Sequence, residues 1–203
     1  MARTVDHKKR EEIAQAAFAL IRAQGVQSTS MTDIARALGM KRPTLYWYFK
    51  DLAAIFEAVL QHMLSDLAQH LLEATEAAAH PIDRLDAHAR AVHGYFATRR
   101  DIIPCLIELW TSSQKGGTLD ADRAMAFTQM YAQPRRQRMI DDLRKGIEEG
   151  IVAPCDPEAI VQLVIAVVDG MLVQQLLRPA HQIPPVHDAL WEHVLRPLKR
   201  NPS

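Results

Sequence analysis

The chain has 203 residues, 48% of them hydrophobic, and its 24 basic and 24 acidic residues leave a formal net charge of zero. This composition allows one or two domains with a hydrophobic core and excludes a low-complexity chain. No run of about 18 uninterrupted apolar residues occurs, and the N-terminus lacks the apolar stretch of a signal peptide, so we expect no membrane contact and a cytoplasmic protein. Cys105 and Cys155 are isolated and are expected to be free thiols.

The charges are unevenly distributed along the chain. Residues 1–50 hold nine basic and four acidic residues, whereas the remainder holds fifteen basic and twenty acidic ones. A basic N-terminal part favours nucleic-acid binding at that end, although asymmetries of this size are common. Arg3 and the cluster at 8–10 have two open interpretations, a phosphate-seeking arm or a solvated terminus.

The first three predicted helices occupy residues 7–48. Apolar spacing predicts a helix over 7–24 that ends at Gly25. Two short helices follow, joined by a turn at Gly39-Met40. Ser30 is a suitable N-cap for the first of them, with Asp33 placed to complete a capping box. Gly39 follows the last apolar position, where a left-handed C-terminal residue is expected.

The helix that begins near Pro43 has an unusual outer face. Leu45 and Phe49 lie four residues apart and share the inward side. The 3.6-residue turn then directs Arg42, Thr44, Tyr46, Trp47 and Tyr48 outward or to the flanks. Arginine can bind guanine in the major groove, and Thr and Tyr hydroxyls can bind phosphates, so we predict a helix-turn-helix with this helix as reader. The predicted DNA-binding residues are Ser30, Thr32, Lys41, Arg42, Pro43, Thr44, Tyr46, Trp47, Tyr48 and Lys50.

Three segments closely resemble the TetR (tetracycline-repressor) family of transcriptional regulators: IAQAAFALIRAQG at 13–25, SMTDIARALGM at 30–40 and PTLYWYFK at 43–50. The motifs cover roughly the first quarter of the chain, and the rest is similar only in helix pattern and length. Lys41 stands where the family usually has a capping Ser. Leu52 stands where many members have a phosphate-binding Lys, which leaves that contact to Lys50. The resemblance implies a ligand-responsive repressor that acts as a homodimer.

Beyond residue 50 the pattern remains helical. We expect helices from the cap Asp51 to about 79, over 81–100, over 120–150, over 157–177 and over 186–198, with an apolar segment at 101–117. Pro134 is expected to kink or split its helix. No strand alternation occurs. The prediction is an all-α chain of nine to ten helices, with a DNA-binding domain at 1–50 and an effector-binding and dimerisation domain at 51–203.

The segment 157–177 is apolar on most sides, so it needs cover on all of them. We predict a partner chain across one face; the alternative is the central helix of a monomer. A two-fold dimer would also double the base contacts of a single reading helix. The predicted interface residues are Val164, Val168, Met171, Leu172, Leu176, Trp191 and Leu195.

Flexible and aromatic residues recur in the middle of the chain. Each one alone is more often ordinary core, but together they can line an apolar pocket. The predicted pocket residues are Met63, Tyr95, Phe96, Cys105, Trp110, Met125, Gln129 and Met130. The resemblance implies an effector pocket in this region, and few ionisable groups accompany these residues, so an apolar or aromatic small molecule is the predicted effector.

Signals of catalysis and metal binding are absent from the sequence. None of the nine His form an i, i+4 pair, and no C-x-x-C, G-x-S-x-G or Gly-rich phosphate loop occurs. We therefore predict no metal, no cofactor and no enzymatic activity. Two alternatives remain: a DNA-binding regulator controlled by a protein partner, and an enzyme with a helix-turn-helix head.

Overall fold

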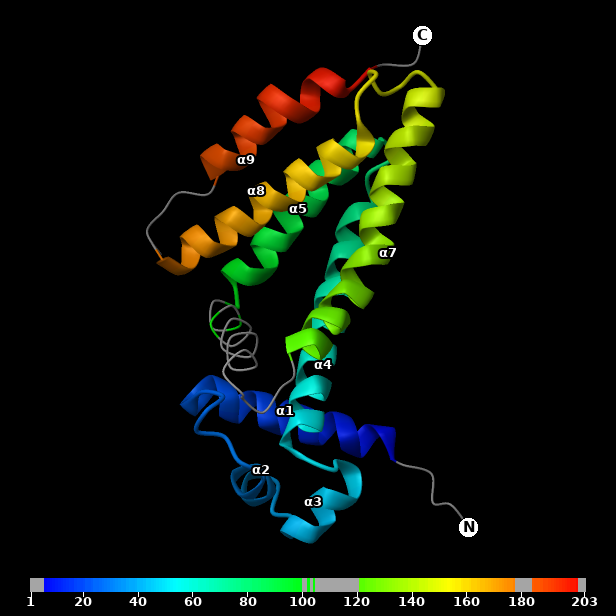
Figure 1. Cartoon of the computed structure of the whole chain (residues 1–203). Helices are drawn as coiled ribbons and strands as arrows, with labels where there is room; N and C mark the ends of the chain where they lie inside the picture. Colours follow the sequence, from blue (N-terminus) through cyan, green and yellow to red (C-terminus); the bar gives the residue numbers. More distant parts are fainter. Residues whose placement is uncertain (1–5, 100–101, 103, 105–120, 178–183, 201–203) are drawn as a thin grey trace. The chain divides into compact units, whose positions relative to one another are not determined.

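The structure is a computed structural model that describes residues 6–99, 102, 104, 121–177 and 184–200 (Figure 1); for 121–128, 131, 176 and 184 it describes the backbone alone. These residues form eight α-helices and a single isolated β-bridge between Val152 and Lys199, so the all-α prediction is confirmed. The predicted segment at 101–117 lies outside the described residues except for positions 102 and 104.

The helix bounds follow the sequence pattern closely. The helices are α1 (His7–Gln24), α2 (Met31–Ala37), α3 (Arg42–Tyr48), α4 (Leu52–Glu76), α5 (Pro81–Ala97), α7 (Ala121–Glu148), α8 (Pro157–Leu177) and α9 (Pro184–Leu190). A π-helical turn at Trp191–Leu195 and a 3-10 turn at Arg196–Leu198 then replace the regular helix predicted to reach 198. Pro197 explains this change, because it has no N–H to donate to the carbonyl one turn earlier.

The described chain divides into two compact units. Unit 1 comprises residues 1–66 and 101–130, and unit 2 comprises residues 67–100 and 131–203. Helices α4 and α7 therefore each contribute to both units. The domain boundary predicted at residue 50 remains a prediction.

The core of unit 1 joins α1, α2, α3 and the first half of α4. Its largest fully buried side chains are Ile13, Ile21, Ile34, Leu45, Phe49, Ile55, Phe56 and Leu60. Asp51 accepts a hydrogen bond from the Ala54 N–H at 2.8 Å and so caps α4, as predicted. The positive φ of Gly25 (85°) and Gly39 (61°) lets the chain leave α1 and α2 abruptly.

In unit 2, α8 lies alongside α5, and α9 and the turn that continues it also contact α5 (Figure 1). Lys199 Nζ lies 2.8 Å from both carboxylate oxygens of Asp83, which ties the C-terminal turn to α5. Pro134 lies inside α7, which continues as one helix, so the predicted split does not occur. The helix ends before Gly150, whose φ is 74°.

Helix α8 is strongly apolar, although much of it is not buried within the described chain. Residues 157–175 have the length and mean hydropathy, 1.5, of a membrane span, and only part of this stretch is buried. Val164, Val168, Met171 and, beyond α8, Leu195 are buried within their own chain, which corrects their assignment to a partner interface: they are core. Leu172 and Trp191 are half-buried, and the Leu176 side chain lies outside the described residues. The exposed large apolar side chains of α8 are Leu163 (42% exposed), Val173 (49%) and Leu177 (72%).

Candidate nucleic-acid interface and ligand pocket

Helix α2 begins with the predicted capping box. The Ser30 hydroxyl accepts the Asp33 N–H at 3.3 Å, and the Asp33 carboxylate accepts the Ser30 N–H at 3.1 Å. The hydrogen bond from Ser30 and the nearby Arg36 guanidinium lower the pKa of the Asp33 carboxyl. The capping box fixes the residue at which α2 begins and therefore the position of the turn that connects α2 to α3.

Helix α3 is held by its inner face alone. Leu45 is 0% exposed and Phe49, just after the helix, is 1% exposed. The opposite face carries Trp47 at 50% and Tyr46 at 42% exposure, which are high values for aromatic side chains. Lys41 occupies the N-cap position without a side-chain cap, as its chemistry predicts.

Four side chains on the outer side and flank of α3 form two pairs. Arg42 Nη2 donates a hydrogen bond to the Tyr46 hydroxyl at 3.0 Å, and its guanidinium lies 5.5 Å from the centre of the Tyr46 ring. The Trp47 and Tyr48 rings meet edge to face, with centroids 4.7 Å apart. Tyr46 thus orients Arg42 before any DNA is bound.

Most of the remaining predicted contact residues are exposed as well. Ser30, Thr32, Lys41, Pro43, Thr44 and Lys50 are exposed, and Tyr48 is half-buried. Lys50 lies 3.8 Å from Asp51, a surface pair too weak to withhold the Lys50 ammonium from a phosphate.

Arg10 has a role that sequence reasoning missed. Its Nη1 donates a hydrogen bond to the Tyr48 backbone carbonyl, and its guanidinium lies 4.0 Å from the centre of the Phe49 ring. Lys9 is paired instead with Glu12 at 2.7 Å. Arg10 therefore fastens the end of α3 to α1, and it is neither an arm nor a solvated terminus. Because the contact spans 38 positions, no local pattern could indicate it.

The predicted pocket residues are divided between the two units, and their assignment to one site remains a prediction. Met63 is buried in unit 1, whereas Tyr95 and Phe96 are buried in unit 2, where their rings meet edge to face at 5.2 Å. Gln129 and Met130 are exposed. Cys105, Trp110 and the side chain of Met125 lie outside the described residues.

A pocket of about 330 Å³ lies elsewhere in unit 2, between the end of α4, the first half of α5 and the middle of α7. Its lining residues are Ala68, Leu72, Thr75, Glu76, Arg84, His88, Pro134, Arg135, Arg138, Met139 and Asp142. None of the predicted pocket residues is among them. This wall combines an apolar strip with several charged groups.

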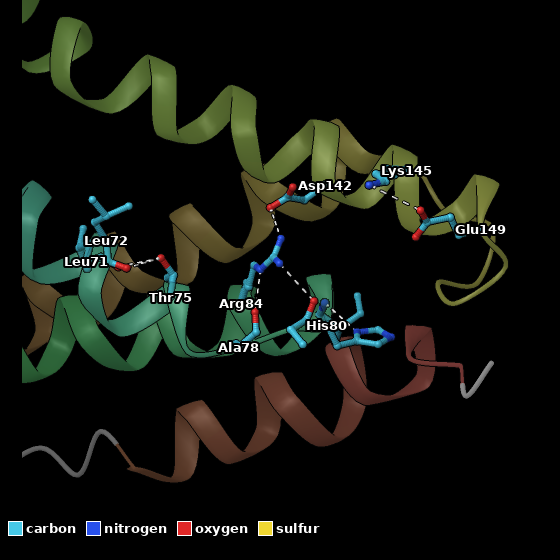
Figure 2. Close-up of polar contacts among 11 residues, drawn as sticks. Leu71, Leu72, Thr75, Ala78, His80, Arg84, Asp142, Lys145 and Glu149 are labelled. Carbon is cyan, nitrogen blue, oxygen red and sulfur yellow. Dashed lines mark hydrogen bonds and ion pairs between the residues drawn. The ribbon is translucent and has the colours of Figure 1, made fainter.

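Arg84 is fully engaged at one end of this pocket (Figure 2). Its Nη1 lies 2.8 Å from the Asp142 carboxylate, its Nε donates to the Ala78 carbonyl at 2.8 Å, and its Nη2 donates to the Ala79 carbonyl at 3.2 Å. The same side chain thus closes the turn after α4 and links α5 to α7. Asp142 is neutralised by this pair.

His88 and Arg135, on the same pocket wall, have fewer hydrogen-bond partners than Arg84 within the described chain. His88 is 6% exposed, and its Nδ1 is buried with no hydrogen-bond partner among the described residues. Burial, and secondarily the positive charge of Arg135, lower the pKa of His88 to about 4, so the imidazole is neutral at physiological pH. Burial also lowers the pKa of the Arg135 guanidinium.

Comparison with known proteins supports the interpretation of the N-terminal helices. Residues 13–59 match the sequence model of "Bacterial regulatory proteins, tetR family". The chain is 23% identical over 172 residues to the HTH-type transcriptional regulator BetI of Rhizobium meliloti (strain 1021), covering 85% of this chain and 80% of that protein. It is 38% identical over 64 residues to the HTH-type transcriptional regulator AcrR of Shigella flexneri, covering 32% of this chain and 30% of that protein.

The fold is shared with a TetR transcription regulator from Haloarcula marismortui ATCC 43049. The TM-score is 0.81 at 15% sequence identity, over 96% of this chain and 100% of that one. Regulators of this family bind operator DNA, act as dimers and are not enzymes. The capped α2, the exposed outer face of α3 and the family match agree, and the chain therefore belongs to the TetR family and is a DNA-binding transcriptional regulator.

Proposed function

We propose that this regulator represses transcription by placing α3 of each of two subunits in successive major grooves, and that a small molecule bound in unit 2 releases it from the operator. The proposed DNA binding is supported by the outer face of α3. It exposes a cation, hydroxyls and two large aromatic rings, while Leu45 and Phe49 hold the helix from behind. Such a face costs solubility unless a partner covers it.

Individual roles follow from position and chemistry. Arg42 is the base-reading residue, because a guanidinium can donate two hydrogen bonds to a guanine edge. Lys41 and Lys50 flank α3 and bind phosphates, which set the register of the helix without reading sequence. Tyr46 holds Arg42 at 3.0 Å, so its hydroxyl contributes to specificity as well as to affinity.

Selection of bound duplexes from a random library tests this proposal. We expect a two-fold symmetric sequence whose half-sites lie about one helical turn apart, because a symmetric dimer reads each half alike. The Tyr46→Phe variant should broaden the preference at the base read by Arg42. Failure to enrich any sequence from the library would refute the proposal.

The dimer surface is proposed from α8. Leu163, Val173 and Leu177 are exposed apolar residues on a helix whose other side packs on α5. Water contact with so apolar a face is unfavourable, and burial against the same face of a second copy removes it. Family members act as dimers, which supports this occupant.

The effector is proposed to act through α4 and α7. Both helices line the pocket of unit 2 and also contribute residues to unit 1, which carries α3. An effector that binds better to the state that does not fit DNA shifts the population toward that state, and only by that difference in affinity. We place this regulator in the cytoplasm, where its DNA lies.

A further inference from the structure

We infer that the pocket of unit 2 takes a small organic carboxylate, with the acid group against Arg135 and an apolar body along Leu72 and Met139. This inference rests on the proposed function, because it names the chemical class of the effector. The pocket presents groups that an uncharged apolar ligand would leave unused.

The pocket carries an excess of one positive charge. Arg84 and Asp142 form an ion pair at 2.8 Å and cancel each other. Arg135 and Arg138 remain, with Glu76 as the other carboxylate on the wall. A ligand with a single negative charge would therefore bring the wall to neutrality.

Arg135 is the cation best placed to bind that charge. It is half-buried, and it has no hydrogen bond or ion pair with any other described residue, in contrast to the three partners of Arg84. A guanidinium that has lost water without gaining an anion is unfavourable, and a planar carboxylate matches its two parallel N–H groups. Arg138 is exposed at the same wall and is satisfied by solvent.

His88 supports the choice of a singly charged ligand. Its imidazole is 94% buried in this wall, since only 6% is exposed, and Nδ1 has no partner within the described chain. Because the ring is neutral, it can make a hydrogen bond to a ligand oxygen but adds no second positive charge. A ligand with two negative charges would leave one of them without a compensating positive charge in the pocket.

The size and the remaining wall indicate the rest of the ligand. A volume of about 330 Å³ lies near the lower end of the roughly 300–1,000 Å³ range of ligand pockets. Ala68, Leu72, Pro134 and Met139 supply an apolar surface, and the Met side chain can adapt to different shapes. A medium-chain or aromatic monocarboxylate fits these limits.

The test uses octanoate and benzoate as probes, with octanamide and benzamide as uncharged isosteres. Binding to the full-length protein is measured by titration calorimetry. We expect both acids to bind, and the amides to bind about tenfold to hundredfold more weakly, as the loss of a charge-assisted hydrogen bond implies. Equal affinity for acids and amides, or no acid binding up to about 1 mM, would overturn the inference.

Two variants locate the charge. Arg135→Gln should weaken acid binding about tenfold or more. Arg135→Lys keeps the charge but loses the planar guanidinium, so its affinity for the acids should lie between those of wild type and Arg135→Gln. Arg136→Gln is the matched control, because Arg136 is adjacent in sequence, does not line the pocket and contacts Gln162 at 3.4 Å. If acid binding is unchanged in both Arg135→Lys and Arg135→Gln, the acids bind at another site, and the inference is wrong. If Arg135→Gln does not fold, Arg135→Lys alone decides.

Operator release separates this inference from the proposed function. Arg135-dependent acid binding that leaves DNA binding unchanged would support the site and contradict its regulatory role. Release of DNA by an uncharged compound, with no binding of either acid, would support a ligand-responsive regulator and contradict the carboxylate.

Discussion

Acidification from pH 7.5 to 5.0 should cost this protein about 2 kcal/mol of unfolding free energy through His88 alone. The folded-state pKa of this histidine is about 4, against 6.5 for the free side chain, mainly because the ring is buried. At pH 5.0 the unfolded chain is therefore protonated at this position, whereas the folded chain is not. Each pKa unit corresponds to about 1.4 kcal/mol, and linkage over this interval gives the stated loss.

The direction of the effect follows from the lowered pKa. The unfolded state binds more protons between pH 6.5 and about 4, so stability rises with pH across this window. The stability that His88 contributes is fully present above pH 6.5 and is lost as pH falls toward 4. The pKa values of His93 and His187 are also lowered by burial, so both add to this loss, whereas the pKa of the Asp169 carboxyl, raised by desolvation, opposes it.

The assay is urea unfolding of wild type and His88→Leu at the two pH values. The variant lacks the titrating ring, so its loss of stability on acidification should be smaller than that of wild type by about 2 kcal/mol. Leu72→Ala is the control, because it alters the same pocket without removing a proton-binding group and should keep the wild-type loss. An equal loss in His88→Leu and wild type would refute a buried neutral His88.

Three further outcomes can be measured. Arg10→Met removes the hydrogen bond to Tyr48 and the stacking on Phe49, so it should cost about 2 kcal/mol of stability and weaken binding to all DNA sequences; Lys9→Met should change DNA binding much less, and similar losses in both would contradict the role of Arg10. Leu163→Glu places a charge on the exposed face of α8 and should yield folded monomers in analytical ultracentrifugation, whereas an unchanged dimer would exclude this face as the interface. Gly146→Ala should cost about 1–3 kcal/mol in a thermal unfolding assay, because the new Cβ would lie 2.6 Å from Val152 Cγ2, and an unchanged melting temperature would show that Val152 moves away freely.

The elements that follow local rules could be predicted from the sequence. Ser30 and Asp33 lie three residues apart, so their mutual capping is a local matter. Leu45 and Phe49 lie four apart, and their spacing fixes which residues of α3 face outward. The exposed face of α3 could therefore be predicted without tertiary information.

The features that depend on distant contacts could not be predicted. Helix α8 is apolar on nearly all sides, so its periodicity does not indicate which face is buried, and the predicted interface residues Val164 and Val168 are buried within their own chain. The pocket of unit 2 is lined by His88 of α5 and Arg135 of α7, and its place depends on how these helices pack. In a sequence, an arginine on a helix usually indicates solvated surface, and a histidine usually indicates a hydrogen-bonded core residue. The pocket prediction therefore relies on Met and aromatic residues.

The most direct test of the account measures Arg42→Ala on two duplexes, the selected operator and a scrambled one, by fluorescence anisotropy at matched salt. We predict a loss of about 1–3 kcal/mol on the operator, a much smaller loss on the scrambled duplex and a relaxed preference at one base pair in each half-site. Lys50→Ala should instead weaken both duplexes alike and reduce the dependence on salt. Equal losses on both duplexes for Arg42→Ala would contradict the assignment of α3 as the helix that reads sequence.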